Sequence, residues 1–236
     1  MIANKYVVDR AIGRGAFGAV FLGHKRSTGE PIAIKIEPSA SSYLRHEVTI
    51  MNYLYGRGVR DIPRIYWFGP HEGNACLVMT YYSSSLSQYV GSLDLVMAKC
   101  ILALSDIHTQ QIIHRDIKPA NILMNGGEPV FIDFGLATVI TGKPTDGITG
   151  SPRFTSYYNH CGEPSSYRDD LISLGYVYIF QSCGSLLWDS GDHVRLKSWE
   201  SIGTRLSGSI LTYMKYCYEL SHEDDPCYDL LTELFR

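Results

Sequence analysis

Two short runs in the middle of the chain carry side chains whose types and spacing could do chemistry. The run 114–121, H-R-D-I-K-P-A-N, holds one carboxylate (Asp116), one ammonium group (Lys118) and one amide (Asn121). Seventeen residues after Asp116, a second carboxylate, Asp133, opens the tripeptide D-F-G. Carboxylate and amide oxygens are hard ligands of the kind that Mg²⁺ prefers, and a carboxylate can accept the proton of a hydroxyl group. Together these groups could transfer a phosphoryl group with the help of a metal ion.

Each run has an ordinary explanation when it is taken alone, because Asp, Asn and Gly are frequent in polar turns. The two runs in this order and at this spacing resemble protein kinases, in which H-R-D-x-x-x-x-N is followed by D-F-G. The resemblance implies that Asp116 accepts the proton of an attacking hydroxyl and that Lys118 offsets charge on the moving phosphoryl group. It also implies that Asn121 and Asp133 hold Mg²⁺ between phosphate oxygens.

Glycines near the start of the chain form another motif. Gly13, Gly15 and Gly18 lie in the sequence G-R-G-A-F-G-A-V at 13–20. Alone the motif is weak, because glycines also serve ordinary hairpins, and a dinucleotide-binding fold would need a helix directly after it. The residues after Gly18 are β-rich instead. The sequence therefore predicts a hairpin that folds over phosphates, with glycines allowing the backbone to approach without a Cβ in the way.

Lys35 ends the sequence I-A-I-K at 32–35, on a predicted third strand. In the kinase pattern this lysine contacts the α- and β-phosphates of the nucleotide. A solvated strand lysine is the alternative, because the neighbours Ile34 and Ile36 do not show which face of the strand is wet. The other motifs favour the functional interpretation.

A helix is predicted over residues 42–55, where apolar residues recur at helical spacing. Glu47 lies near the middle of this helix, a turn away from apolar residues on either side, and we expect it to pair with Lys35. An exposed helix glutamate is the alternative. The apolar stripe consists of Leu44, Val48, Met51 and Tyr55.

Two short strands are predicted at 64–69 and 74–80, after which the chain runs through Tyr81 and Tyr82 into a serine-rich segment. Backbone N–H and C=O groups at this crossing could bind the edge of an adenine ring. The candidate apolar walls for that base are Ile12, Val20, Ala33, Met79 and Leu123. Each of them fits an ordinary core position at least as well.

The second half of the chain has mostly helical periodicity. The remaining predicted elements are a helix at 94–110, a hairpin at 122–132, a long functional loop at 138–165, a helix at 169–183, an irregular stretch at 184–208, and helices at about 209–220 and 227–235. The hairpin turns at Gly126-Gly127 and would deliver Asp133 to the site. The helix at 169–183 is almost wholly apolar, so we expect it to be buried on all sides. The helix at 94–110 should present Leu95, Ala98, Ile101, Leu102 and Ile107 to the core.

Composition limits the classes of partner. The 236 residues carry a formal net charge of −3, which does not favour nucleic acid or an anionic membrane as a partner. The first residues lack the apolar core of a secretory signal, and the longest apolar stretch, 171–188, is interrupted by polar residues. Six cysteines without zinc-site spacing favour buried free thiols in a reducing compartment, with disulfides as the alternative. We therefore expect an intracellular protein, in the cytoplasm, the nucleus or both.

The C-terminal half is similar to the casein kinase 1 family, and the wider kinase resemblance covers nearly the whole chain. The A-P-E tripeptide of ordinary kinases is absent. In its place are G-S-P-R-F-T-S-Y-Y-N-H at 150–160 and S-Y-R-D-D-L-I-S-L-G-Y at 166–176, which resemble the motifs of that family. L-L-W at 186–188 and the terminal segment 224–236 also match it.

This resemblance implies roles for further residues. The hydroxyl of Ser151 would bridge Asp116 and Lys118, and Asp170 would hold the backbone of the central loop. Arg153 and Arg168 would form an anion-binding region on the substrate side.

Some positions depart from the family pattern. Tyr167 replaces an arginine, so one charge that would bind a substrate phosphate is missing, and the resemblance does not decide whether phosphate-primed or acidic substrates are preferred. Residues 189–208 are shorter than the family norm, and no C-terminal regulatory tail is expected. The sequence does not assign an activation-loop phosphosite, although Thr145, Thr149 and Thr155 are available.

These observations predict an α+β protein with a bilobal kinase fold. Residues 1–80 would form a small β-rich N-lobe with one long helix, and residues 81–236 a larger, mainly helical C-lobe. The resemblance implies a monomeric serine/threonine kinase that uses ATP and Mg²⁺ on Ser and Thr hydroxyls of protein substrates. A catalytically silent scaffold usually lacks the strand lysine, the loop aspartate or the D-F-G aspartate, and all three are present. A small-molecule phosphotransferase typically lacks the complete glycine motif and the lysine equivalent to Lys118.

Overall fold

The computed structural model describes residues 1–15, 18–39, 41–141 and 149–236. The chain divides into two compact units. The N-terminal unit comprises residues 1–83 and 131–135, and the C-terminal unit comprises residues 84–130 and 136–236. The division into lobes at residue 80 stays a prediction.

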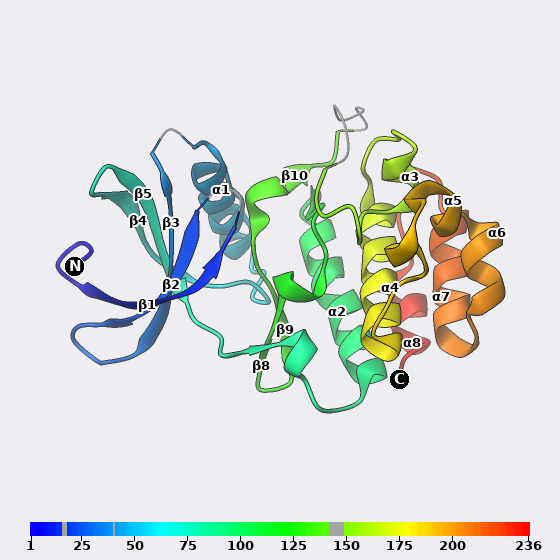
Figure 1. Ribbon diagram of the computed structural model, residues 1–236, viewed down its shortest axis with the longest axis horizontal. Coiled ribbons are helices and arrows are strands. Elements are labelled where there is room, and N and C mark those ends of the chain that lie inside the picture. Colours follow the sequence, from blue (N-terminus) through cyan, green and yellow to red (C-terminus); the bar gives the residue numbers. More distant parts are fainter. Residues whose placement is uncertain (16–17, 40, 142–148) are drawn as a thin grey trace. The chain divides into compact units, whose positions relative to one another are not determined.

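The N-terminal unit is a twisted antiparallel sheet with one helix packed against it (Figure 1). The sheet has the strand order β1-β2-β3-β5-β4, so β3 lies at its centre. The elements are β1 (Tyr6–Arg14), β2 (Ala19–Lys25), β3 (Pro31–Pro38), α1 (Tyr43–Gly56), β4 (Ile65–His71) and β5 (Asn74–Thr80). The central strand is rich in β-branched residues, which pack well on a pleated surface.

The register of the sheet separates its two faces. Ile32, Ile34, Cys76 and Val78 are buried together in one core cluster on one face. On β3 the residues between them point to the opposite face, because side chains alternate along a strand. Lys35, the member of this second set that matters for the site, pairs with Val20 on β2 and Leu77 on β5.

Helix α1 buries the predicted stripe only in part. Leu44, Val48 and Met51 are buried against the sheet, whereas Tyr55 is 37% exposed, so the prediction is wrong at that residue. Glu47 lies on the buried face of the helix, where it is 1% exposed.

The C-terminal unit is mainly helical (Figure 1). Its principal helices are α2 (Leu93–His108), α4 (Tyr167–Cys183), α7 (Gly208–Glu219) and α8 (Tyr228–Glu233). Helix α4 packs against both α2 and α7, and α8 packs against α2. The short strands are β6 (Ser84–Ser85), β8 (Ile122–Asn125) and β9 (Glu128–Phe131) in one sheet, and β7 (Ile112–Ile113) with β10 (Thr138–Val139) in another.

Helix α4 is the central helix of this unit, but it is not buried on all sides as predicted. Residues 168–177 are buried, and residues 178–183 become half-exposed or exposed as the helix reaches the surface. The helix ends at Gly184, whose φ of 74° is the left-handed conformation in which glycine commonly ends helices. A Cβ on Gly175 would overlap the sulfur of Met214, so this glycine permits close packing of α4 on α7.

Four other expectations need correction. Leu95 and Leu102 of α2 are 54% and 43% exposed, because the buried face of this helix instead includes Val96 and Leu104. The stretch predicted as irregular at 184–208 contains short helices, namely η4 (Leu187–Ser190), α5 (His193–Lys197), α6 (Trp199–Ile202) and η5 (Gly203–Arg205). These segments are too short to show a helical period in the sequence.

The third correction concerns the cysteines, and the fourth concerns the long loop. All six cysteines are free, but Cys161, Cys183 and Cys227 are exposed. Within 138–165 the structure contains strand β10 and helix α3 (Tyr157–His160), and the candidate phosphosite Thr145 lies outside the described residues.

The predicted fold class is confirmed: an N-terminal antiparallel sheet with a helix precedes a mainly helical region. In the part of the chain that the structure describes, we find no helix with the length and hydropathy needed to cross a membrane.

Candidate active site

Lys35 is the centre of a charged cluster in the N-terminal unit. Its ammonium group donates hydrogen bonds to Glu47 Oε2 at 2.7 Å and to Asp133 Oδ1 at 2.8 Å. Glu37 Oε1 lies 3.7 Å from the same nitrogen. Strand β3 supplies the lysine, helix α1 supplies Glu47, and the segment 131–135 supplies Asp133. The predicted contact between Lys35 and Glu47 is present, and its role in binding a nucleotide stays a prediction.

The electrostatics of this cluster fix the charge of Lys35. Burial lowers the pKa of Lys35, but the attraction of Glu47 and Asp133 outweighs burial and raises the pKa above its ordinary value. Burial raises the pKa of Glu47 to about 7, against the attraction of Lys35. Among the described residues, Glu47 Oε1 has no hydrogen-bond partner. The cluster therefore offers a fixed cation, whereas the side chain of Asp133 is 43% exposed and accessible to a ligand.

The sheet register brings several predicted nucleotide contacts onto one face. Val20 is opposite Lys35, and Ala33 is opposite Met79, so these four side chains share the face that carries the ammonium group. Ala33 and Met79 are 7% and 8% exposed. An apolar surface next to a cation suits a base joined to phosphates.

The glycine motif is described in part. The N–H of Gly15 donates to the carbonyl of Gly18 at 2.9 Å, while Ala16 and Phe17 lie outside the described residues. A Cβ on Gly18 would overlap the carbonyl oxygen of Ile36, so only glycine allows this approach of the loop to β3. Gly13 is opposite Val20, where β1 and β2 pair next to the loop.

The other predicted nucleotide contacts are more dispersed. Ile12 is 39% exposed on β1. Tyr82 follows β5, and burial raises the pKa of its hydroxyl. Leu123 belongs to β8 in the C-terminal unit. The roles of all three stay predictions.

Asp116 is the centre of a second cluster, in the C-terminal unit. Its Oδ2 accepts hydrogen bonds from Lys118 Nζ at 2.7 Å and from Asn121 Nδ2 at 3.0 Å. Its Oδ1 accepts a hydrogen bond from the backbone N–H of Ser151 at 2.9 Å. The carboxylate is therefore fixed in orientation by a cation, an amide and a backbone donor.

The contacts that Ser151 makes with this cluster differ in part from the prediction. Its hydroxyl accepts a hydrogen bond from Lys118 at 2.9 Å, but its link to Asp116 runs through the backbone N–H, not the hydroxyl. The preceding residue, Gly150, has a φ of 86°, and a Cβ there would overlap the carbonyl oxygen of Arg115. Glycine thus lets the segment lie directly on the central loop.

The backbone of the central loop is held from helix α4. Asp170 accepts hydrogen bonds from the N–H groups of His114 and Arg115 at 2.6 and 2.9 Å, as the resemblance implies. Burial opposes ionisation of Asp170, yet hydrogen bonds and nearby histidines keep its pKa below the ordinary value. Arg115 has a φ of 66°, and its Nε donates to the carbonyl of Leu136.

Sequence reasoning missed a part of this support. His108 Nε2 lies 3.0 Å from Asp170 Oδ2, and its Nδ1 lies 2.5 Å from the hydroxyl of Tyr228 on α8. The ring of Tyr167 stacks on His108 with 4.8 Å between centroids. Only the position of His108 in the last turn of a predicted helix, six residues before His114, could have indicated this contact.

The proposed magnesium ligands fit the metal in chemistry. Asn121 uses its amide nitrogen to hold Asp116, which leaves its amide oxygen as the atom suited to a cation. Asp133 offers a carboxylate, and both are the hard oxygen donors that Mg²⁺ prefers. The two residues belong to different units, and their joint ligation stays a prediction. Among the described residues there is no group of three or more His, Cys, Asp or Glu side chains arranged to hold a metal ion.

The predicted anion-binding arginines are both engaged. Arg168 is 3% exposed and donates to the carbonyl of Leu220 and to Glu163, so the prediction that it binds anions on the substrate side is wrong. Arg153 forms a two-point ion pair with Asp189, with distances of 2.7 and 2.6 Å. An anion would have to compete with that carboxylate.

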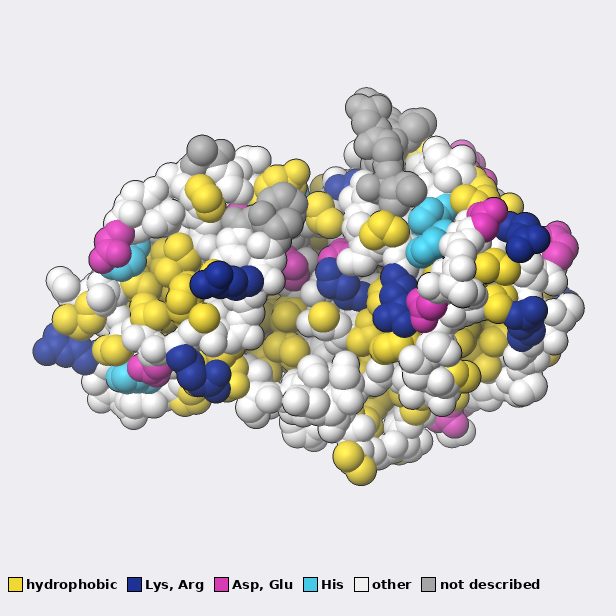
Figure 2. All heavy atoms as spheres, viewed as in Figure 1, with side chains coloured by type: hydrophobic (Ala, Val, Ile, Leu, Met, Phe, Trp, Pro, Cys, Tyr) yellow, Lys and Arg dark blue, Asp and Glu magenta, His cyan; other side chains and the backbone are white. Residues whose placement is uncertain are grey.

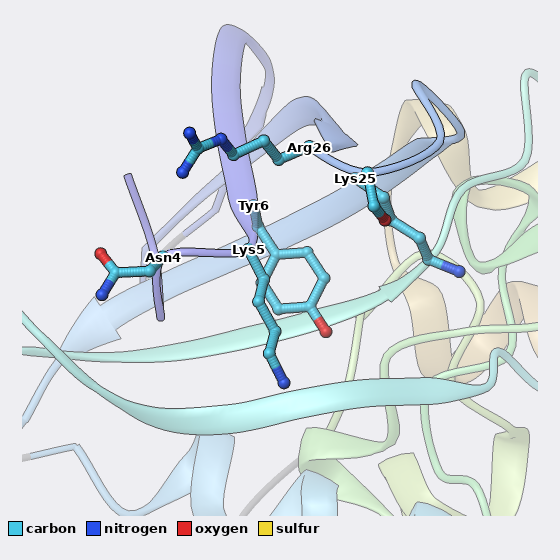
Figure 3. A pocket seen from close by; sticks show the side chains of 6 residues that line it. Asn4, Lys5, Tyr6, Lys25 and Arg26 are labelled. Carbon is cyan, nitrogen blue, oxygen red and sulfur yellow. The ribbon is translucent and has the colours of Figure 1, made fainter.

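A pocket of ≈ 450 Å³ lies in the N-terminal unit, and Figure 3 shows the side chains around it. Its lining residues are Asn4, Lys5, Tyr6, Lys25, Arg26 and Ser27. None of the predicted site residues lines it. Lys25 is already paired with Glu30 at 2.8 Å and lies over the ring of Tyr66.

A comparison with protein families agrees with this geometry. The family model described as the protein kinase domain matches residues 6–236 of the chain.

Proposed function

Because the chain belongs to the protein kinase domain family, we propose that it is an active serine/threonine protein kinase. It transfers the γ-phosphoryl group of ATP to Ser and Thr hydroxyls of protein substrates. The observation that carries this proposal is the fixed carboxylate of Asp116, which is 7% exposed and receives three hydrogen bonds from Lys118, Asn121 and Ser151.

The C-terminal cluster supplies proton transfer and charge compensation. Asp116 orients the substrate hydroxyl and accepts its proton, which makes the oxygen a better nucleophile. Lys118 lies 2.7 Å from this carboxylate, so the same cation can offset negative charge that develops during transfer. Ser151 holds Lys118 in place through its hydroxyl.

The N-terminal cluster positions the nucleotide. When bound, Mg-ATP supplies the transferable phosphoryl group, with its charge partly neutralised by the metal ion. Lys35 would bind the α- and β-phosphates with its ammonium group, and Glu47 fixes the direction of the lysine side chain. Asp133 and Asn121 would provide oxygen atoms for the metal ion. The face formed by Val20, Ala33 and Met79 would lie against the base, and Ile12, Tyr82 and Leu123 stay further candidates for contact with it.

The preference for Ser and Thr and the likeness to casein kinase 1 rest on sequence motifs. The pairing of Lys118 with Ser151 supports them, because both residues belong to those motifs. Substrate choice departs from the family pattern, since Arg168 is buried and Tyr167 stacks on His108. We expect phosphate-primed peptides to be favoured weakly or not at all. A peptide array with and without a phosphate three residues before the target measures this preference, and a strong gain from the phosphate would contradict it.

Asp116→Asn tests the proposal. The amide keeps the size of the side chain but cannot accept the proton, so we expect transfer to a protein substrate to fall by about 10²-fold or more. ATP binding, measured by calorimetry, should change little. Asp106→Asn is the matched control, because Asp106 is an exposed acid on α2 of the same unit. Turnover by Asp116→Asn close to that of the control would refute the role of Asp116.

A further inference from the structure

Lys197 is a fully buried lysine that the proposed chemistry does not use. It ends helix α5 and has an exposure of 0%. Its ammonium nitrogen donates to the carbonyl of Pro152 at 2.8 Å and to the carbonyl of Thr155 at 2.5 Å. Burying an ammonium group without a carboxylate partner is costly, and only burial shifts its pKa, which it lowers to about 7. The contacts that Lys197 makes should therefore explain why a lysine is buried at this position.

The carbonyls that Lys197 holds belong to the segment that presents Ser151. Residues 151–155 form a turn in which the N–H groups of Phe154 and Thr155 donate to the carbonyl of Ser151 at 2.9 and 3.0 Å. The hydroxyl oxygen of Thr155 lies 3.0 Å from the same carbonyl and 3.2 Å from that of Thr149, so its one proton can be donated to either, and Thr155 is 6% exposed. One side of this turn therefore contacts the Asp116 cluster through Ser151, and Lys197 holds carbonyls on the other side.

Two histidines, His160 and His193, lie next to the carbonyl of Pro152 that Lys197 holds. Figure 2 shows a group of histidine side chains on the surface of the C-terminal unit, and the rings of His160 and His193 lie 5.5 Å apart. Nε2 of His160 lies 3.0 Å from the carbonyl oxygen of Pro152 and 3.2 Å from Lys197 Nζ. Nδ1 of His193 lies 3.2 Å from the same carbonyl oxygen.

Among the residues that the structure describes, two aromatic rings also pack against the ammonium nitrogen. From α4 and η4, the rings of Tyr176 and Trp188 lie with centroids 5.1 and 4.9 Å from Nζ. From α7, the hydroxyl of Tyr218 donates to the backbone carbonyl of Lys197. The nearby Arg153 and Asp189 are paired with each other.

The contact between Lys197 and His160 depends on proton count. When one of the two groups is protonated, one nitrogen donates and the other accepts at 3.2 Å. When both are protonated, two cations face each other, one of them on the buried Lys197, and they repel. Burial lowers the pKa of His160, followed by the repulsion of Lys197 and His193, so the doubly protonated state is reached only at acid pH.

We propose that Lys197 is a positioning residue for phosphoryl transfer: with His160 and His193 it holds the 151–155 turn so that Ser151 engages Asp116 and Lys118, and acid pH releases the turn. This inference rests on the proposed function for its kinetic readout. Its structural readout, the protection of the turn, is independent of that function.

Lys197→Met tests the positioning role, because methionine has a similar length and carries no donor. We expect kcat/KM for a peptide substrate to fall at least tenfold while KM for ATP changes less than twofold. Hydrogen exchange at the amides of Phe154 and Thr155 should accelerate at least tenfold at the same pH. Lys215→Met, at an exposed lysine of α7, is the matched control. Unchanged exchange at both amides with peptide kcat/KM within twofold of the control would overturn the proposal.

His160→Gln tests the acid release and also serves if Lys197→Met does not fold. Glutamine can hydrogen-bond from a similar position but does not titrate. As the pH is lowered below 6.5, the ordinary pKa of histidine, we expect the wild-type peptide kcat/KM to fall. When wild type and His160→Gln are compared at the same acid pH, the two amides should exchange faster in the wild type. Identical pH profiles and identical exchange in the two proteins would overturn the acid release. If the wild type transfers no phosphate but Lys197→Met still exposes the turn, the proposed function fails, and the structural part of the inference, that Lys197 holds the turn, stands without it.

Discussion

Substituting alanine for Gly150 should lower kcat for phosphoryl transfer strongly and lower the free energy of unfolding only moderately. Gly150 has a φ of 86°, and it precedes the residue whose N–H orients Asp116. An added Cβ would lie closer than 3.0 Å to the carbonyl oxygen of Arg115 and 3.3 Å from Asp116 Oδ1. The perturbation therefore acts directly between the central loop and the segment that completes its hydrogen bonds.

The size of the effect follows from two contributions. A left-handed backbone conformation costs an alanine about 1–2 kcal/mol. Ordinary contact of a Cβ begins at 3.4 Å, so the segment and the loop must move apart by roughly 1 Å. A displacement of about 1 Å in a catalytic arrangement can cost about 10²-fold in rate. We expect kcat to fall by about that factor.

Gly162 provides a matched control for the backbone contribution. It lies in the same unit with a φ of 85°, and a Cβ there would meet nothing within 4 Å. Gly162→Ala should lower the free energy of unfolding by about 1–2 kcal/mol and leave kcat almost unchanged. Denaturant unfolding and steady-state kinetics on both variants separate the two contributions. A kcat for Gly150→Ala within threefold of that for Gly162→Ala would refute the argument.

Two further predictions concern the charged clusters. Lys35→Met should lower kcat/KM by orders of magnitude because it removes the cation that Glu47 and Asp133 hold, and an unchanged value in steady-state assays would show that Lys35 is an ordinary strand residue. Lys197 binds a proton in the unfolded chain up to pH 10.5 but in the folded chain only up to about pH 7, so its contribution to the free energy of unfolding should rise with pH between those values. Between pH 7 and 8.5 the free energy of unfolding of the wild type should rise by about 1–2 kcal/mol relative to that of Lys197→Met, as measured by denaturant titration. If the free energies of unfolding of the two proteins change in parallel with pH, the lowered pKa of Lys197 in the folded chain is contradicted.

Local patterns in the sequence predicted the elements that carry the site. The β-rich run around Lys35 and the apolar period of α1 predicted the two elements, but alternation along the strand left the face of Lys35 open, and the kinase motifs favoured its pairing with Glu47. The same periods failed where elements are short or change environment, as in residues 184–208 and at the exposed end of α4.

Contacts between distant segments were harder to predict. The N–H of Ser151, not its hydroxyl, reaches Asp116, and no residue type reveals a backbone donor. Arg168 has the sequence of a surface cation, yet its contacts with Glu163 and Leu220 bury it. Lys197 lies in a segment without helical period, so its burial depends wholly on tertiary packing.

The most direct test of the account is transfer of phosphate from ATP to a protein hydroxyl by the wild-type chain. The purified protein would be incubated with Mg²⁺, γ-labelled ATP and a serine- and threonine-containing protein substrate, followed by phosphoamino acid analysis. The account predicts phosphoserine and phosphothreonine, a requirement for Mg²⁺, and loss of label with Asp116→Asn but not with Asp106→Asn. ATP binding without label on any hydroxyl would contradict it and would identify the chain as a silent member of its family.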